Sequence, residues 1–359
     1  MRTLHLACLP FPSPQGTQAL LRAMLDALAA AGHETHLLTY AAGAHAEGAA
    51  AAPTDWTHHR LSDWPPVRSL RSGPSPGKVA LDLRMVTALR ERARALRPDV
   101  VVAHNVEAAL VGRTLRGVPR VYVAHTRFDA ELGTYFAHPR PWSRIGDALD
   151  RAACGLDATV AITPDLAQHL RRYTRAAFVM PPWPVADPPT AAERAVRPWK
   201  GPVLLYAGNL DAYQGLDVLL EASRGLRLLV ATSSDPRPLR RHPHVAVWPL
   251  QTEADRRRAH AACDLVVVPR RAPGGLPIKL LDALARDVPV VAQRRALAGL
   301  RPQGVRAVAD DDPAALRAVI EQSLRCPPRG GRRWLADACA PAGFAKRFVS
   351  TLRALLPVR

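Results

Sequence analysis

The sequence predicts an α/β fold with two doubly wound, mostly parallel sheets. Short apolar runs of about four to eight residues, typical of buried strands, alternate along the chain with helical patterns. The alternation stops once, at the proline-rich segment 180–201, and then begins again. A length of 359 residues suits two domains that each bury their own core.

The first half opens with a strand, a helix and a second strand. The run at 4–11 indicates a buried strand, 17–32 indicates a helix that ends at Gly32, and 34–40 indicates the next strand. The elements expected after these are a helix at 78–98, strands at 99–105, 120–126 and 157–163, and a helix opened by Pro164. Strands that alternate with helices favour a parallel sheet.

The segment 180–201 has too many prolines for a helix or a central strand, so we place the domain boundary there. The domains are expected at 1–182 and 183–343, with 344–359 as a C-terminal helix that packs back on the first domain. Strands are then expected at 202–208, 226–233, 244–250, 264–270 and 288–293, and helices at 215–225, 253–263, from Pro277 onward, and at 310–324. Asp312 with Pro313 predicts a helix cap there, the alternative being a metal-binding acidic cluster.

The formal net charge of +18 suggests nucleic acid or an anionic membrane as a partner. Almost all of the cations are arginines, which indicates a compositional origin for much of this charge. Aromatic residues make up only 5% of the chain, and no nucleic-acid-binding motif is present. We therefore expect no nucleic-acid partner.

Five scattered cysteines without a CxxC pair predict neither a disulfide framework nor a zinc site, so a reducing cytoplasm fits best. The first 16 residues hold an apolar run too short for a signal peptide, and no run is long enough to span a membrane. We expect a cytoplasmic protein whose membrane contact, if it has one, is peripheral at the inner face of the plasma membrane.

Candidate binding residues follow the predicted strands, because doubly wound domains bind ligands beyond the carboxyl ends of their strands. With two such domains, the ligand is expected in an inter-domain cleft. The candidates placed by this rule are Gly16, His125, Gly208, Asn209, Gly274, Gly275 and Leu276.

Lys279 and Asp282 stand in the otherwise apolar helix that follows Gly274 and Gly275. The glycines allow close approach to a phosphate, and the helix directs free N–H groups at the same place. Lys279 would add a positive charge for a diphosphate, and Asp282 would accept hydrogen bonds from a ribose diol. The alternative is a Lys–Asp pair on a solvated face.

Two segments, "LLYAGNLDAYQGLDVLLEA" (204–222) and "GGLPIKLLDALARDVPVVA" (274–292), resemble the retaining glycosyltransferases of family 4, which have the GT-B fold. The resemblance extends over nearly the whole chain, including "VAHT" (123–126). It implies two Rossmann-like domains, an acceptor-side domain followed by a nucleotide-sugar-binding domain. It also implies that His125 lies over the sugar and acceptor as the catalytic residue, that Asp282 binds the ribose, and that no metal or other cofactor is needed.

The sequence departs from the family pattern at three charged positions. The first glutamate of the family's paired-glutamate motif falls on Gly274, and the usual Arg and Lys that hold the diphosphate fall on Asn209 and Gln214. Lys279 is the candidate replacement for the missing cations, with Arg270 and Arg271 as weaker ones. The losses are also compatible with a different donor or with loss of catalysis. For His125 and His104 the alternative is a structural role.

The resemblance implies transfer of a sugar from a nucleotide-diphosphate donor to an acceptor hydroxyl of a glycan or lipid. A sugar-nucleotide epimerase and a non-catalytic binding protein remain as alternatives. Segment 58–78 has the composition of an interfacial loop for anionic lipid, the alternative being a solvated loop and a soluble acceptor. The residues that give it this composition are Arg60, Trp64, Val67, Arg68, Leu70, Arg71 and Lys78.

Overall fold

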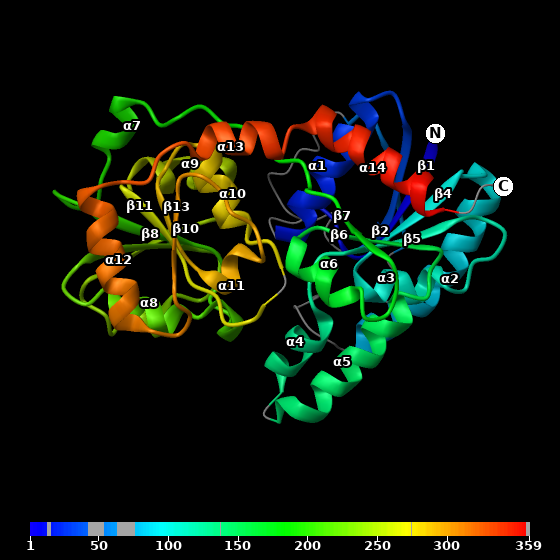
Figure 1. Cartoon of the computed structure of the whole chain (residues 1–359), viewed down its shortest axis with the longest axis horizontal. Coiled ribbons are helices and arrows are strands. Elements are labelled where there is room, and N and C mark those ends of the chain that lie inside the picture. The colour runs from blue at the N-terminus through cyan, green and yellow to red at the C-terminus, as the bar shows by residue number, and fades with distance from the viewer. Residues whose placement is uncertain (13–15, 42–53, 63–75, 137, 274, 357–359) are drawn as a thin grey trace. The chain divides into compact units, whose positions relative to one another are not determined.

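The computed structural model describes residues 1–12, 16–41, 54–62, 76–136, 138–273 and 275–356 (Figure 1). The chain divides into two compact units, Met1–Pro182 with Pro341–Arg359, and Trp183–Ala340. We call them the N-terminal unit and the C-terminal unit. Each contains one parallel sheet with helices between most successive strands, which confirms the predicted α/β fold with two doubly wound sheets.

The N-terminal unit is built on a seven-stranded sheet in the order β3-β2-β1-β4-β5-β6-β7. Its strands are β1 (Arg2–Pro10), β2 (Glu34–Tyr40), β3 (Thr57–Arg60), β4 (Val100–His104), β5 (Arg120–Ala124), β6 (Ala158–Ala161) and β7 (Ala176–Phe178). Its helices are α1 (Gly16–Ala30), α2 (Pro76–Leu96), α3 (Asn105–Gly112), α4 (Phe128–Leu132), η1 (Gly133–Tyr135), α5 (Pro139–Ala153), α6 (Pro164–Leu170) and α14 (Pro341–Leu355). The last helix, α14, packs against α1 (Figure 1).

The two faces of this sheet bury different side chains of β1. Leu4 and Leu6 belong to the core on one face, whereas Ala7 and Leu9 pack with α1 on the other. Alternate residues of a strand point to opposite faces, so odd-numbered residues of β1 face α1. This alternation places His5 on the α1 face.

The C-terminal unit is built on a six-stranded sheet in the order β10-β9-β8-β11-β12-β13. Its strands are β8 (Val203–Ala207), β9 (Arg227–Thr232), β10 (Val245–Pro249), β11 (Leu265–Val268), β12 (Val290–Gln293) and β13 (Val305–Val308). Its helices are α7 (Ala191–Ala195), η2 (Ala212–Gln214), α8 (Leu216–Ala222), η3 (Arg237–Leu239), α9 (Glu253–Ala261), α10 (Ile278–Ala285), α11 (Arg294–Leu297), α12 (Pro313–Arg325) and α13 (Gly331–Ala338). The central strands β8 and β11 are fully buried.

Two local predictions are decided by helix caps. The side chain of Asp312 accepts a hydrogen bond from the Ala315 N–H, with proline at the next position, so the predicted cap of α12 is confirmed. The prediction of no helix within 180–201 is wrong, because α7 lies there. Thr190 and Glu193 form a capping box that starts this short helix after the prolines.

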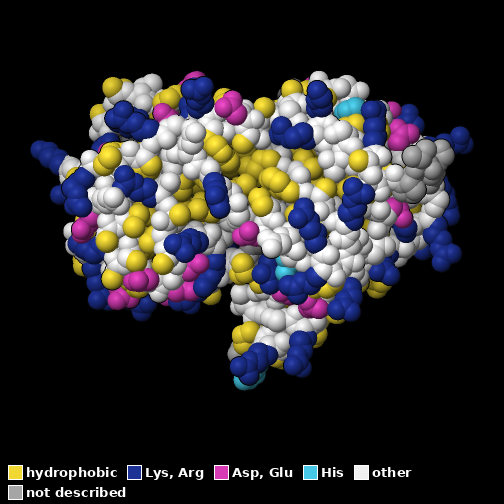
Figure 2. Space-filling view, in the orientation of Figure 1, with side chains coloured by type: hydrophobic (Ala, Val, Ile, Leu, Met, Phe, Trp, Pro, Cys, Tyr) yellow, Lys and Arg dark blue, Asp and Glu magenta, His cyan; other side chains and the backbone are white. Residues whose placement is uncertain are grey.

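The lysine and arginine side chains are spread over the face of the molecule shown in Figure 2, and acidic side chains lie among them. This distribution agrees with a compositional origin of the net charge of +18. In the described part of the chain, no helix combines the length and the hydropathy needed to cross a membrane. Within segment 58–78, residues 63–75 lie outside the described part of the chain, so the predicted interfacial loop stays a prediction.

Candidate functional site

The ammonium group of Lys279 lies in the interior of the C-terminal unit, on the first turn of α10. Its Nζ donates a hydrogen bond to Oε1 of Gln214 at 2.7 Å and lies 4.2 Å from the ring centroid of Tyr206. The residue is only 7% exposed. Burial, together with the positive charge of Arg270, lowers the pKa of Lys279 well below its usual value. A bound anion would reverse this effect by favouring the charged form.

Gly208, which follows β8, allows the close approach of the lysine. A Cβ atom on this glycine would lie 3.1 Å from both Cε and Nζ of Lys279, which is tighter than ordinary van der Waals contact. Its φ of 156° is also rare for a residue with a side chain. The glycine predicted from its place after a strand therefore borders the lysine side chain.

Asn209 and Gln214 continue the hydrogen-bonded cluster from Lys279. Gln214 Nε2 donates to Oδ1 of Asn209 at 2.8 Å, and Asn209 Nδ2 donates to Asp211 Oδ2 at 2.6 Å and to Tyr213 Oη at 3.2 Å. Of the two positions at which the family resemblance expects cations, Gln214 is therefore bonded directly to Lys279, and Asn209 is linked to the lysine through Gln214. We call Asn209, Gln214 and Lys279 the lysine cluster.

The two arginines that were weaker candidates are held by other partners. Arg270 is buried, its Nε donates to the Ala272 carbonyl at 2.8 Å, and its guanidinium lies 5.7 Å from the Tyr213 ring centroid. Arg271 is exposed and forms an ion pair with Asp217. Lys279 is therefore the cation in direct contact with Gln214.

The structure describes only part of the glycine-rich turn before α10. Gly275 and Leu276 are buried and lead into Pro277, which caps the helix, while Gly274 lies outside the described residues. The helix begins at Ile278, so Lys279 stands in its first turn, beside N–H groups that have no acceptor within the helix.

Asp282 lies one turn further along α10 and has partners other than Lys279. Arg256 Nη1 donates to its Oδ2 at 3.1 Å, and Arg286 Nη1 lies 3.5 Å from its Oδ1. Burial raises the pKa of Asp282, and the two arginines oppose that rise. The alternative of a Lys279–Asp282 ion pair is therefore wrong in the described structure, although the predicted ribose contact stays a prediction.

In the N-terminal unit, His125 lies at the end of a row of three buried histidines. His104 Nδ1 is 3.0 Å from Nε2 of His125, and His104 Nε2 is 2.9 Å from Nδ1 of His5. All three side chains are at most 2% exposed. Burial lowers the pKa of His125 to about 4 and that of His5 to about 3, so the rings are neutral at neutral pH. We call these residues the histidine row.

The histidine row contains one residue that sequence reasoning missed. The apolar pattern of 4–11 predicts only a buried strand at His5, although a histidine in an otherwise apolar strand is itself a signal that a polar partner is nearby. Gly16, the remaining candidate of this unit, is the first residue of α1.

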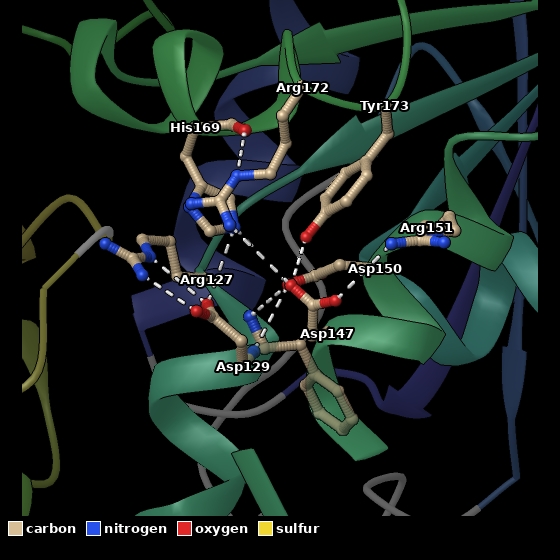
Figure 3. A network of polar contacts seen from close by, with 9 residues as sticks. Arg127, Asp129, Asp147, Asp150, Arg151, His169, Arg172 and Tyr173 are labelled. Carbon is tan, nitrogen blue, oxygen red and sulfur yellow. Dashed lines mark hydrogen bonds and ion pairs between the residues drawn. The ribbon is translucent and has the colours of Figure 1, made fainter. Parts of the chain in front are cut away.

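A second polar group missed by sequence reasoning joins α4, α5 and α6. Figure 3 shows Asp129, Asp150 and His169 facing one another, with His169 Nε2 3.6 Å from Asp129 and 4.0 Å from Asp150. Arg172 Nη2 donates to His169 Nδ1 at 3.0 Å, so Nε2 is the nitrogen that carries hydrogen in the neutral ring. Because a metal ligand needs a free lone pair, this arrangement suits a polar anchor better than a metal site.

Asp150 is the fully buried member of this anchor. Its Oδ2 accepts hydrogen bonds from the backbone N–H groups of Phe128 and Asp129, at 3.1 and 3.2 Å. These bonds fix the first turn of α4 on α5 (Figure 3). Burial raises the pKa of Asp150 to about 7, with the charge of Asp129 adding to the effect.

Comparisons with known proteins agree with this architecture. A sequence model of Glycosyltransferase Family 4 matches residues 14–182, and a model of Glycosyl transferases group 1 matches residues 201–325. No curated protein sequence matches the chain. Sucrose-phosphate synthase from Thermosynechococcus elongatus has a similar structure, with a TM-score of 0.79 and 18% identity over 99% of each chain. HepE from Anabaena, solved in complex with UDP and glucose, has a TM-score of 0.74 and 13% identity over 99% of this chain and 100% of its own.

The two parallel sheets and the two matching models define an enzyme class, the glycosyltransferases with the GT-B fold. Within that class, the chain belongs to the family 4-like glycosyltransferases. The resemblance noted from the sequence is thereby confirmed, together with the predicted enzymatic function.

Proposed function

We propose that the chain transfers a sugar from a nucleotide-diphosphate donor to an acceptor hydroxyl with retention of configuration, and that the lysine cluster binds the donor diphosphate. The single observation that carries the proposal is the position of Lys279 Nζ, 2.7 Å from Gln214 and beside Gly208. A cation thus stands beside the positions at which family members carry their diphosphate-binding Arg and Lys.

The hydrogen-bonding capacity of Lys279 supports the proposal. An ammonium group has three N–H donors. Among the described residues, Gln214 supplies the acceptor for one of them. The other two are available to diphosphate oxygens, and such charge-assisted hydrogen bonds are among the stronger ones in proteins.

The backbone is proposed to add further donors. The N–H groups at the start of α10, which follows Gly275 and Leu276, face the C-terminal edge of the sheet where doubly wound domains bind ligands. Gly208 would allow a phosphate as well as the lysine to approach the main chain. Asp282 is proposed to accept hydrogen bonds from the ribose, with the lone pairs that Arg256 and Arg286 leave unused.

In the transfer step, the bond between the sugar and the donor phosphate breaks and negative charge develops on the leaving diphosphate. The acceptor oxygen bonds to the same face of that sugar carbon, and its proton passes to a phosphate oxygen of the leaving diphosphate. A preorganised cation and backbone donors stabilise that charge, an effect often worth about 3–4 kcal/mol for a single donor. Lys279 would supply the positive charge without a metal ion or another cofactor. The N-terminal unit, with His125, is proposed to serve the reacting sugar and the acceptor.

The acceptor is proposed to be a glycan or a lipid. The composition of segment 58–78 supports an anionic membrane surface as a peripheral contact at the inner face of the plasma membrane. This proposal has its own test. Sedimentation with vesicles of anionic lipid at low salt, reversed by salt, is the expected result, and failure to sediment would favour a soluble acceptor.

The donor proposal is tested with a panel of nucleotide sugars, each incubated with the full chain. Slow release of nucleoside diphosphate from one of them, together with a rise in melting temperature, is the expected result. Lys279→Met should abolish both effects, while Lys200→Met, at an exposed lysine of the same unit, should leave them intact. A panel without any hydrolysis or thermal shift would contradict the proposed function.

A further inference from the structure

The three rings of the histidine row lie on one diagonal of the N-terminal sheet. Ala7 of β1 is opposite His104 of β4, so His5 lies two residues before that pairing. His104 is in turn opposite Val123 of β5, and His125 lies two residues beyond it. The row therefore runs from the middle of the sheet to its C-terminal edge.

The contacts within the row couple the hydrogen positions of the three rings. A neutral imidazole has one N–H donor and one acceptor nitrogen. His104 uses both nitrogens within the row, at 2.9 Å to His5 and 3.0 Å to His125. Both contacts are hydrogen bonds only if all three rings carry hydrogen on Nδ1 or all three carry it on Nε2.

The two ends of the row decide between these arrangements. His5 Nε2 and His125 Nδ1 are both buried and have no hydrogen-bond partner among the described residues. Hydrogen on every Nε2 would orphan an N–H donor at His5, and hydrogen on every Nδ1 would orphan one at His125; buried donors of that kind are rare. His5 lies in the middle of the sheet, whereas His125 lies at its C-terminal edge, where doubly wound domains bind ligands and a ligand can supply the missing acceptor. The arrangement with hydrogen on Nδ1 is therefore favoured.

The outer end of the row then has a defined chemical character. His125 Nε2 accepts the hydrogen bond from His104, which leaves Nδ1–H as the remaining donor. His125 Nδ1 is buried and has no partner among the described residues, so an acceptor oxygen of a ligand at this edge of the sheet would complete the row. Burial lowers the pKa of all three rings, which agrees with a neutral row.

We infer that His104 and His5 are positioning residues that hold His125 in the Nδ1–H form, so that His125 donates a hydrogen bond to a substrate oxygen and does not act as a general base. The inference rests on the proposed role of His125 at the reacting sugar. It assigns to His104 and His5 a part in the reaction that the family resemblance does not imply.

The hydrogen positions can be measured directly on the full chain labelled with ¹⁵N-histidine. Long-range ¹H–¹⁵N spectra distinguish the two neutral tautomers of each ring. We expect His5, His104 and His125 to be neutral between pH 6 and 8 and to carry hydrogen on Nδ1. Hydrogen on Nε2 of His125, or different tautomers within the row, would overturn the inference.

Variants add a readout of the positioning role. His104→Phe keeps a ring but removes both hydrogen bonds, so His125 should lose its single tautomer and kcat should fall about tenfold, with the donor KM within about twofold. His104→Gln, whose amide can donate and accept, should restore part of kcat. The matched control is His260→Phe, at a buried histidine of the C-terminal unit, which should leave the His125 signals unchanged.

The two readouts separate this inference from the proposed function. If the three rings carry Nδ1–H but no nucleotide sugar is consumed, the tautomer assignment stands and the proposed function fails. If sugar transfer occurs and His104→Phe leaves both kcat and the His125 tautomer unchanged, the transferase stands and the positioning role is wrong.

Discussion

The two units bury their functional candidates in chemically different ways. The N-terminal unit holds three neutral imidazoles that bond to one another, whereas the C-terminal unit holds one ammonium group against an amide and an aromatic ring. Burial lowers the pKa of His125 and of Lys279 alike, but a bound anion would favour the charged form of the lysine. Neutral histidines suit the uncharged hydroxyls of a sugar, and a cation suits a diphosphate. The proposed function therefore asks something different of each unit, a hydrogen bond to the sugar from His125 and a positive charge for the diphosphate from Lys279.

The largest effect on turnover is expected from His125→Ala. Removing a hydrogen bond that matters mainly in the transition state should lower kcat about 100-fold and leave nearly unchanged the Kd for UDP, which serves as the probe because the similar structure of HepE was solved with it. Steady-state kinetics and calorimetry measure the two quantities. Equal losses of turnover and affinity, with a lower melting temperature, would show that His125 has a structural role and would break the comparison.

The variant Asp150→Asn tests whether the buried carboxyl group of Asp150 is protonated in the folded N-terminal unit. Its pKa is raised to about 7, so the folded state binds the proton more tightly than the unfolded state. The carboxyl group therefore contributes stability at low pH that is lost as the pH rises from about 4 to 7. Asp150→Asn cannot titrate, and its stability relative to the unchanged chain should rise by about 2 kcal/mol between pH 5 and 7.

Urea unfolding at several pH values measures this difference. Taking the difference between the two proteins cancels the opposite effect of the buried histidines, whose lowered pKa values make the chain less stable as the pH falls. A difference in stability that stays constant from pH 5 to 7 would mean that Asp150 is ionised throughout.

Asp282→Asn tests the ribose part of the C-terminal site. Because the ribose is common to a nucleoside and its diphosphate, uridine and UDP should both bind about tenfold more weakly. Some loss of stability is also expected, since Arg256 and Arg286 would lose a charged partner. A weakening confined to UDP would place Asp282 near the phosphates instead.

The smallest effect is expected from Gly208→Ala. The new Cβ would lie 3.1 Å from Lys279 Nζ, so the lysine must shift by a few tenths of an ångström, and UDP affinity should fall about fivefold. Gly225→Ala is the matched control, because its φ is also positive, at 78°, but no atom lies within 4 Å of the added Cβ. If the two variants bind UDP with equal affinity, the close approach of Lys279 to Gly208 does not matter for UDP binding.

The alternation of apolar runs and helical patterns predicted ten of the thirteen strands in the described part of the chain, because central parallel strands are buried on both faces. The three strands that it missed, β3, β7 and β13, are short edge strands that are only partly buried. Short elements were missed where local chemistry decides, as in α7 with its Thr190–Glu193 capping box. Lys279 was found through its place in the helix, but its partner Gln214 is 65 residues away, and no local pattern predicts that hydrogen bond. His5 was missed for the same reason, since its partner His104 is 99 residues away.

The central claim, that Lys279 supplies the positive charge for the donor diphosphate, is tested most directly by calorimetry of UDP binding. Lys279→Met keeps the apolar stem against Tyr206 and removes the charge. It should weaken binding by about 1.5–3 kcal/mol, or roughly 10- to 150-fold, without lowering the stability of the fold. The exposed control Lys200→Met should bind UDP as the unchanged chain does. Unchanged UDP affinity of Lys279→Met would contradict the account.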